Sequence, residues 1–193
     1  MTQRICLLLG HPDGQSEHFC HALAAAYARG AEAAGHRVAR LDLAALQPEP
    51  LGSAAEFETA PAGPMAEARA ALADATHLVE IFPLWLGGMP ARLKAFFEQL
   101  ARAGFALGIS ERGWPEGRLK GRSARVVVTM GMPALAYRIW FLNAGVGVLK
   151  RMILGMAGIA PVRQTTIGGV EAMSDAARAR WLARVEALGR AAR

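Results

Sequence analysis

Residues 77–100, HLVEIFPLWLGGMPARLKAFFEQL, place a short apolar run, a glycine-rich loop and an amphipathic stretch in direct succession. The run over residues 77–82 predicts a buried strand, and Pro90 suits the first turn of a following helix. That helix is indicated by apolar side chains at helical spacing, namely Leu93, Phe96, Phe97 and Leu100. A strand that leads through a loop into a helix is typical of a βαβ unit, and therefore of a parallel sheet.

The same alternation extends over the rest of the chain. Further strands are predicted over residues 4–10, 36–43, 124–129 and 162–167. Helices are predicted over residues 17–34 and 65–73. A helical region follows the fourth strand, residues 124–129, and extends to about residue 158 with interruptions at Gly145 and Gly147. Ser174 is expected to cap a closing helix that buries Trp181, Leu182, Val185 and Leu188.

Two connections are longer than the others. Residues 47–64 contain several prolines and acidic residues and predict a loop over one edge, and residues 104–122 form a glycine-rich excursion. Five strands and five helices in this order predict an α/β fold with a doubly wound sheet. One domain over residues 1–193 is the expected organisation, because 193 residues with 53% hydrophobic content suit a single core.

Composition excludes several broad classes of protein. The two cysteines, Cys6 and Cys20, are too few for a disulfide framework and favour a reducing cytoplasm. The apolar region over residues 133–161 is interrupted by charged residues before it reaches a bilayer-spanning length, so no membrane insertion is expected. The formal charge of +6 comes from arginines dispersed among alanines, a pattern that disfavours nucleic-acid binding.

In an open α/β sheet, ligands bind beyond the carboxyl ends of the strands. This rule selects three loops, over residues 10–18, 83–89 and 129–137. The first loop, GHPDGQSEHF, opens a helix, so its amides could hold a phosphate with help from the Ser16 hydroxyl and the His11 imidazole. It lacks both GK[ST] and GxGxxG, which disfavours a Walker loop and a Rossmann fold. An ordinary turn in which Ser16 caps the helix remains the alternative.

The start of this helix also contains potential metal ligands. His18, Cys20 and His21 are close in sequence, but residues one and two apart on a helix do not face each other. Only His18 and His21 could therefore share an ion, and no metal is expected.

The second and third loops favour a flat ligand. In FPLWLGGMP, the glycines allow close approach of the backbone, and Trp85 with Leu84 and Leu86 can wall an aromatic ring system. A hydrophobic turn buried under another loop is the alternative. In TMGMPALAY, Gly131 offers backbone donors and Tyr137 follows about two turns later.

At these residues the chain resembles the flavodoxin-like NAD(P)H:quinone reductases, which include the mammalian quinone reductases and the ancillary subunit of bacterial glutathione-gated potassium efflux. The likeness is most specific over residues 81–106, and HPDGQS and VVVTMGMPALAY resemble the phosphate loop and the strand-four loop. It implies a flavodoxin-like doubly wound sheet of five parallel strands in the order 2-1-3-4-5. It also implies a homodimer whose active site is roofed by the second subunit, with residues 139–159 as an interface.

The resemblance also assigns roles to individual residues. It implies that the flavin phosphate lies against His11, Ser16, His18 and Phe19, and that the isoalloxazine lies along Pro83, Leu84, Trp85 and Leu86. It implies that the pyrimidine edge meets Thr129, Met130, Gly131 and Met132, with Tyr137 as a catalytic residue that hydrogen-bonds the acceptor. A packing tyrosine on a dimer-facing helix is the alternative role for Tyr137.

The chain departs from the family pattern at three places. The phosphate loop is about two residues longer than usual, Met130 and Met132 stand where many members have threonine and glycine, and Asn143 replaces a histidine of the mammalian enzymes.

The expected function is transfer of two electrons from NADPH or NADH through FMN, or alternatively FAD, to a quinone or similar aromatic acceptor. The amides of Gly131 and Met132 are the candidates for stabilising negative charge on the reduced flavin. Three alternatives remain: an electron-carrier flavodoxin, a redox-sensing ancillary subunit of a membrane transporter, and a nucleic-acid-binding domain. Electron carriers of this kind are usually acidic, whereas this chain is basic.

Overall fold

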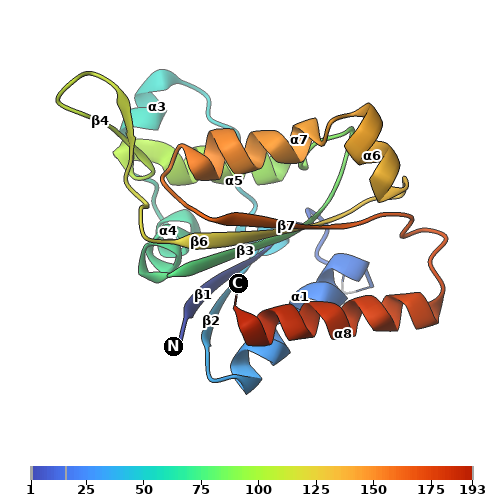
Figure 1. Cartoon of the computed structure of the whole chain (residues 1–193). Coiled ribbons are helices and arrows are strands. Elements are labelled where there is room, and N and C mark those ends of the chain that lie inside the picture. Colours follow the sequence, from blue (N-terminus) through green and yellow to red (C-terminus); the bar gives the residue numbers. More distant parts are fainter. Residues whose placement is uncertain (1, 16, 193) are drawn as a thin grey trace.

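The computed structural model describes residues 2–15 and 17–192. Its centre is a five-stranded sheet in the order β2-β1-β3-β6-β7 (Figure 1). All neighbouring strands in this sheet pair in parallel. The strands are β1 (Arg4–Leu9), β2 (Arg37–Asp42), β3 (His77–Pro83), β6 (Ser123–Thr129) and β7 (Val162–Ile167). The predicted strands and their 2-1-3-4-5 order are confirmed, and the architecture is a flavodoxin-like α/β fold.

A separate antiparallel pair of strands lies between β3 and β6 in the sequence and is not part of the main sheet. β4 (Leu107–Ile109) and β5 (Pro115–Gly117) form a hairpin inside the glycine-rich excursion, away from the main sheet (Figure 1). The sequence predicted no strands there, because three-residue strands carry too few residues for an alternating pattern.

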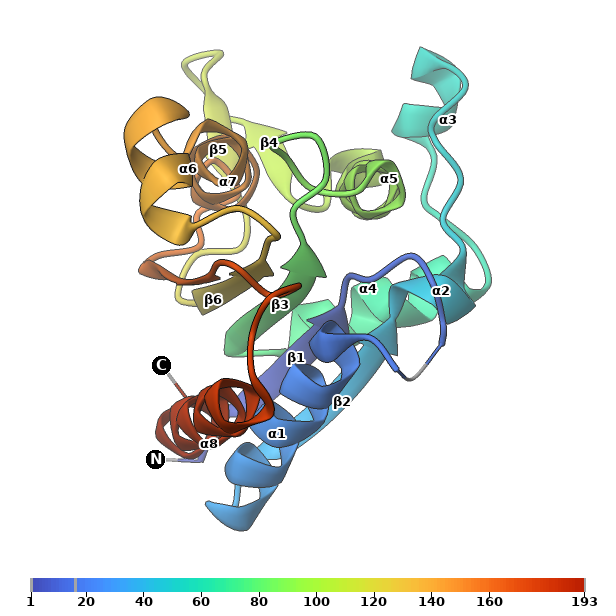
Figure 2. The same cartoon turned by 90° about the vertical axis from the view of Figure 1, so that its right-hand side faces the viewer.

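Helices cover both faces of the sheet (Figures 1 and 2). One face is covered by α1 (Phe19–Ala33) and α8 (Asp175–Ala191). The other is covered by α4 (Pro64–Asp74), α5 (Ala91–Ala101) and the π-helical segment η2 (Val148–Gly155), and η1 (Arg102–Gly104) follows α5.

Two glycines allow α1 and α8 to touch through their backbones. A Cβ on Gly30 would lie 2.0 Å from the Glu186 carbonyl oxygen, and a Cβ on Gly189 would lie 2.1 Å from that of Tyr27. Any larger side chain at either position would separate the helices.

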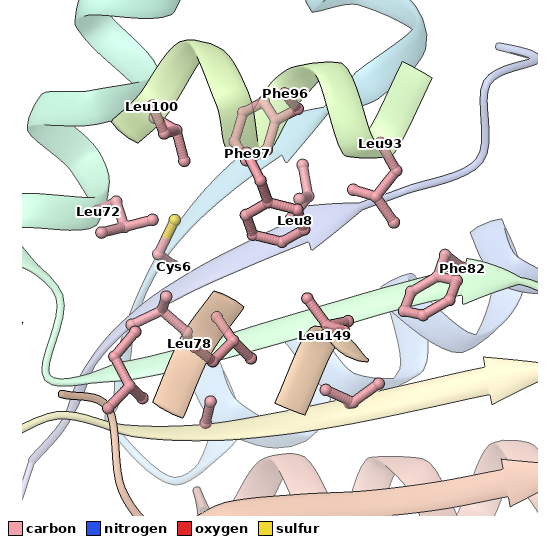
Figure 3. Packing of buried hydrophobic residues seen from close by; sticks show 14 of the residues in the cluster. Cys6, Leu8, Leu72, Leu78, Phe82, Leu93, Phe96, Phe97, Leu100 and Leu149 are labelled. Atoms are coloured by element: carbon pink, nitrogen blue, oxygen red, sulfur yellow. The ribbon is translucent and has the colours of Figure 1, made fainter. Parts of the chain in front are cut away.

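The face under α5 and η2 holds the larger part of the core (Figure 3). Side chains of α5 point from above onto Cys6, Leu8, Leu78 and Phe82 of the sheet. Glu80 lies between Leu78 and Phe82 on β3 and is 2% exposed, and its Oε2 has no hydrogen-bond partner among the described residues. Desolvation by burial raises the pKa of this carboxyl to about 8, which favours its uncharged form at neutral pH.

Several predictions of detail need correction. The connection over residues 47–64 contains a helix, α3 (Ala54–Glu58), and is preceded by α2 (Leu43–Leu46). The helical region after β6 is divided into α6 (Ala134–Trp140), α7 (Ala144–Gly147) and η2. Its break lies at Leu142 and Asn143, which have positive φ, and not at the glycines of α7.

The closing helix, α8, begins with the predicted cap, but fewer of its apolar side chains are fully buried than predicted. The Ser174 hydroxyl accepts a hydrogen bond from the Ala177 N–H at 3.4 Å, as predicted. Val185 is fully buried, whereas Trp181, Leu182 and Leu188 are only partly buried. No helix in the described part of the chain is both long and apolar enough to cross a membrane.

Candidate functional site

The three loops selected from the sequence meet at the carboxyl edge of the sheet, which faces the viewer in Figure 2. The Gly10 N–H donates to the Ile81 carbonyl at 2.8 Å, which ties the first loop to β3. The Leu84 N–H donates to the Thr129 carbonyl at 2.7 Å, which ties the second loop to the third. The backbone therefore fixes the mutual position of all three loops.

The second loop forms a tight turn from Trp85 to Gly88. These two residues exchange backbone hydrogen bonds of 2.9 Å each, and the central residues Leu86 and Gly87 both have positive φ. Two positive φ values are the combination found in type I′ turns. A leucine at positive φ is unusual, and here it projects a fully exposed side chain. Trp85 is also 49% exposed, so the turn presents apolar groups at the sheet edge, as a wall for a flat ring would.

Tyr137 supports this turn from behind. Its hydroxyl donates to the Gly87 carbonyl at 2.9 Å and accepts from the Val146 N–H at 3.3 Å. The side chain is 1% exposed. Because the hydroxyl already donates and accepts inside the protein, its placement matches the alternative packing role and disfavours the expected contact with an acceptor.

Gly145 makes a second contact with the same turn. A Cβ at this position would lie 1.9 Å from the Gly87 carbonyl oxygen, so only glycine permits the observed distance between α7 and the turn. Asn143, at the position of the family's histidine, pairs its side-chain amide reciprocally with Gln164 at 2.8 and 2.9 Å.

In the third loop, the residues differ in what they offer a ligand. The Met130 N–H donates to Ile167 and its carbonyl accepts from Val170, while its side chain is buried in the core. Thr129 is likewise buried, and its hydroxyl lies 3.3 Å from the sulfur of Cys20. The Met130 N–H is therefore already paired within the protein, and the flavin contact of Met130 stays a prediction from the resemblance.

Gly131 and Met132 remain as the donors of this loop. Within the described ranges, neither N–H has a hydrogen-bond partner, although the Met132 carbonyl accepts from Gly169 at 3.1 Å. The hydrogen bond from Gly169 to the Met132 carbonyl holds these two adjacent amides in place, and they therefore form a preorganised site for developing negative charge.

The first loop brings three imidazole rings together. The rings of His11 and His18 stack with centroids 4.0 Å apart, and the His18 Nε2 lies 2.9 Å from the Asp13 carboxylate. α1 begins at Phe19, and His18 occupies the N-cap position without capping through its side chain. The first N–H groups of α1 therefore receive no hydrogen bond from a capping side chain, and free N–H groups at a helix start are what a phosphate site requires. The expected contribution of Ser16 lies outside the described residues.

His21 completes this cluster. Both of its ring nitrogens are buried and have no hydrogen-bond partner among the residues described, and its ring lies 5.7 Å from that of His11. Desolvation lowers the pKa of both His11 and His21, which favours their neutral forms. A neutral imidazole carries one N–H, so His21 has one unpartnered donor, and such a donor beside uncapped helix amides fits a bound phosphate.

Residues 2–15 and 17–192 contain no group of three or more His, Cys, Asp or Glu that could hold a metal ion. His21 was considered from the sequence only as a metal ligand.

Two arginines near the site were missed altogether. Arg92 reaches the Pro12 carbonyl at 3.4 Å, and the Arg178 guanidinium lies 5.2 Å from the centre of the Phe19 ring. Both occupy the first turns of helices. Since helices that follow parallel strands begin at the carboxyl edge of the sheet, their positions after Pro90 and Ser174 could have indicated both residues.

Comparison with known proteins agrees with the observed fold. The family described as having a flavodoxin-like fold matches residues 3–188. The FMN-dependent NADH:quinone oxidoreductase 1 of Jannaschia sp. (strain CCS1) is 35% identical over 114 residues, or 59% of this chain and 57% of that protein. The matched stretches cover little more than half the length of two curated relatives, at 57% and 56%, and less than a third of two others, at 30% and 28%.

Two solved structures are similar over nearly their whole length. Smu.1420 from Streptococcus mutans UA159 has a TM-score of 0.84 and 29% identity, covering 97% of this chain and 98% of that one. The NAD(P)H:quinone oxidoreductase from Methanothermobacter marburgensis has a TM-score of 0.81 and 23% identity, covering 98% of each chain. The second likeness supports the fold.

Proposed function

The chain belongs to the family of proteins with a flavodoxin-like fold, and from this premise we propose that it is an FMN-dependent oxidoreductase. It takes two electrons from NADH or NADPH and passes them to a quinone or similar aromatic acceptor. The name of the Jannaschia relative, an FMN-dependent NADH:quinone oxidoreductase, supports the choice of FMN over FAD and of a quinone as acceptor. The observation that carries the proposal is the meeting of an exposed apolar turn, free amides and an uncapped helix at one edge of the sheet.

The described residues fit FMN. The isoalloxazine would lie against the turn from Trp85 to Gly88. Apart from sequence neighbours, no heavy atom of the described residues lies within 4 Å of a Cβ built on Gly87 or Gly88. The amides of Gly131 and Met132 would face its pyrimidine edge. The phosphate would bind the amides at the start of α1, beside His11 and His21.

When bound, FMN supplies the hydride and electron chemistry. The chain's own residues perform the remaining tasks. The Gly131 and Met132 amides stabilise negative charge without having to reorganise, because the Met132 carbonyl is anchored by Gly169. Trp85 and Leu86 exclude water from one face of the ring, and the imidazoles donate protons in hydrogen bonds to the phosphate.

The absorption spectrum of the purified protein tests the assignment. We expect a flavin spectrum, release of FMN on denaturation, and anaerobic bleaching by NADH followed by recovery on addition of a quinone. A colourless protein that also fails to bind added FMN in calorimetry would refute the proposal. A comparison of KM for NADH and NADPH decides the donor.

Tyr137→Phe tests whether Tyr137 positions the turn. Loss of the hydroxyl removes the hydrogen bonds to Gly87 and Val146, so we expect FMN affinity to fall about fivefold, in keeping with about 1 kcal/mol for a hydrogen bond. The rate of quinone reduction by FMN-saturated enzyme should stay near that of the wild type.

Tyr27→Phe is the matched control for this substitution. The Tyr27 hydroxyl is buried on the opposite face of the sheet and has no hydrogen-bond partner in the described residues, so its loss should not weaken FMN binding. A slow oxidative half-reaction with unchanged FMN affinity in Tyr137→Phe would instead assign Tyr137 to catalysis.

We also propose that the protein is a homodimer. Exposed apolar side chains gather on α6, the turn after it and η2, and they are Leu135, Ile139, Trp140, Phe141, Leu142, Val148, Met152 and Met156. Several exposed apolar side chains on neighbouring segments of the chain favour an interaction surface. Sedimentation should show a dimer, and a monodisperse active monomer would exclude it.

A further inference from the structure

An open cleft of about 530 Å³ adjoins the candidate flavin site on the side of α5. Its lining includes Pro12, Pro48, Glu49, Pro50, Trp85 and Arg92. The volume is within the range of small-molecule sites. Of the residues assigned individually to FMN, only Trp85 lines it, and Pro12 and Asp13 of the first loop form another part of its wall, so the cleft borders the flavin site.

We propose that this cleft binds the adenosine-phosphate half of NADH, with the purine against Trp85 and the prolines and a phosphate at Arg92. The inference rests on the proposed function, since it assigns a place to the part of the electron donor that lies beyond the nicotinamide. It selects NADH over NADPH as the donor.

The position of Trp85 connects the two compartments. Its indole lies with its ring centroid 6.0 Å from that of His11, at the border between the phosphate loop and the exposed turn. A dinucleotide with its nicotinamide at the sheet edge would therefore reach the cleft by passing over Trp85. Aromatic and proline surfaces suit a purine, because both offer a flat apolar face.

Arg92 supplies the cation for a phosphate. It is exposed, and among the described residues its only hydrogen bond is the 3.4 Å contact with the Pro12 carbonyl. The guanidinium is therefore held over the cleft by a weak contact while most of its donors remain available. A planar guanidinium binds phosphate oxygens in pairs.

The opposite wall of the cleft is fixed before any ligand binds. Gln99 is buried, and its amide donates to the Glu49 carbonyl at 2.9 Å and to the Glu56 carboxylate at 3.2 Å. Arg102 holds the same connection by donating to the carbonyls of Glu56 and Thr59 at 2.9 Å each. A preformed wall reduces the entropy lost on binding.

The charges in the cleft favour NADH. Arg92 is its one cation in the described part of the chain, while Asp13 and Glu49 also line it. Carboxylates accept hydrogen bonds from ribose hydroxyls and repel the additional 2′-phosphate of NADPH.

Arg92→Gln tests the site through the difference between two donors. NADH carries the adenosine-phosphate half, and reduced nicotinamide mononucleotide lacks it. We expect the KM for NADH to rise about tenfold, as for loss of a charge-assisted hydrogen bond, with the effect confined to NADH. Binding of 5′-AMP to the FMN-loaded protein, measured by calorimetry, should be lost in parallel. Glu49→Gln should lower the ratio of kcat/KM for NADH to kcat/KM for NADPH.

Arg112→Gln is the matched control, since Arg112 is an exposed arginine in the hairpin between β4 and β5 and should leave every value unchanged. If the protein binds FMN and accepts electrons from NADH but Arg92→Gln alters neither KM nor 5′-AMP binding, the cleft is not the site and the proposed function stands. Failure to bind FMN at all overturns the proposed function instead.

Discussion

Glu80→Gln is expected to raise the free energy of unfolding by about 3 kcal/mol at pH 7 and by almost 5 kcal/mol at pH 9, and to have little effect at pH 4.5. In the folded protein, burial raises the pKa of Glu80 from 4.5 to about 8. The unfolded chain therefore releases this proton at a lower pH than the folded chain. The contribution of Glu80 to the free energy of unfolding is largest below pH 4.5. It declines as the pH rises from 4.5 to about 8 and is constant at higher pH.

Glutamine removes this dependence because it has the shape of the protonated side chain and cannot ionise. Urea denaturation of both proteins at several pH values measures the difference between them. Glu111→Gln is the control, since Glu111 is exposed near the tip of the hairpin between β4 and β5. Parallel stability curves for Glu80→Gln and the wild type between pH 5 and pH 9 would show that Glu80 is not held in its neutral form.

Gly145→Ala is expected to weaken FMN binding at least tenfold and to cost about 2–3 kcal/mol of stability, as for other overpacked sites. The added Cβ would lie 1.9 Å from the Gly87 carbonyl oxygen and 2.8 Å from the Gly88 Cα. Both atoms belong to the turn that presents Trp85, and that carbonyl also accepts the Tyr137 hydrogen bond. The turn must therefore move, and the proposed wall for the isoalloxazine moves with it.

Fluorescence titration with FMN and chemical denaturation measure these two effects separately. Gly52→Ala is the matched control, because its Cβ would meet nothing closer than a Glu56 carboxylate oxygen at 3.7 Å. If Gly145→Ala binds FMN as tightly as the wild type, the turn does not carry the flavin.

The sequence was most informative where one local pattern determines the outcome. The central strand β3 (His77–Pro83) was predicted to within one residue, because a continuous apolar run beside a glycine-rich loop has few alternatives. The three loops of the site were located for a related reason, since the order of strands and helices alone decides which ends of the strands meet.

The remaining features depend on contacts between distant segments. The end of β7 and the residues after it decide which amides of the third loop are free, because Ile167 and Val170 form hydrogen bonds with the main chain of Met130. Tyr137 is buried because the turn from Trp85 to Gly88 covers it, about fifty residues earlier in the chain. The sequence shows Glu80 within an apolar run. The pKa of its carboxyl could not be predicted, because a cation that would lower this pKa could come only from the elements packed against β3.

The backbone contact between α1 and α8 imposes an order of events on the newly made polypeptide. Residues 19–33 leave the ribosome before residues 175–191, which form the helix that packs against them. Until that segment is synthesised, the small side chains around Gly30 have no neighbour on that side, and the helix that begins at the phosphate loop is only partly held. We therefore expect the proposed FMN to bind only after this region has been translated, when α8 has packed against α1.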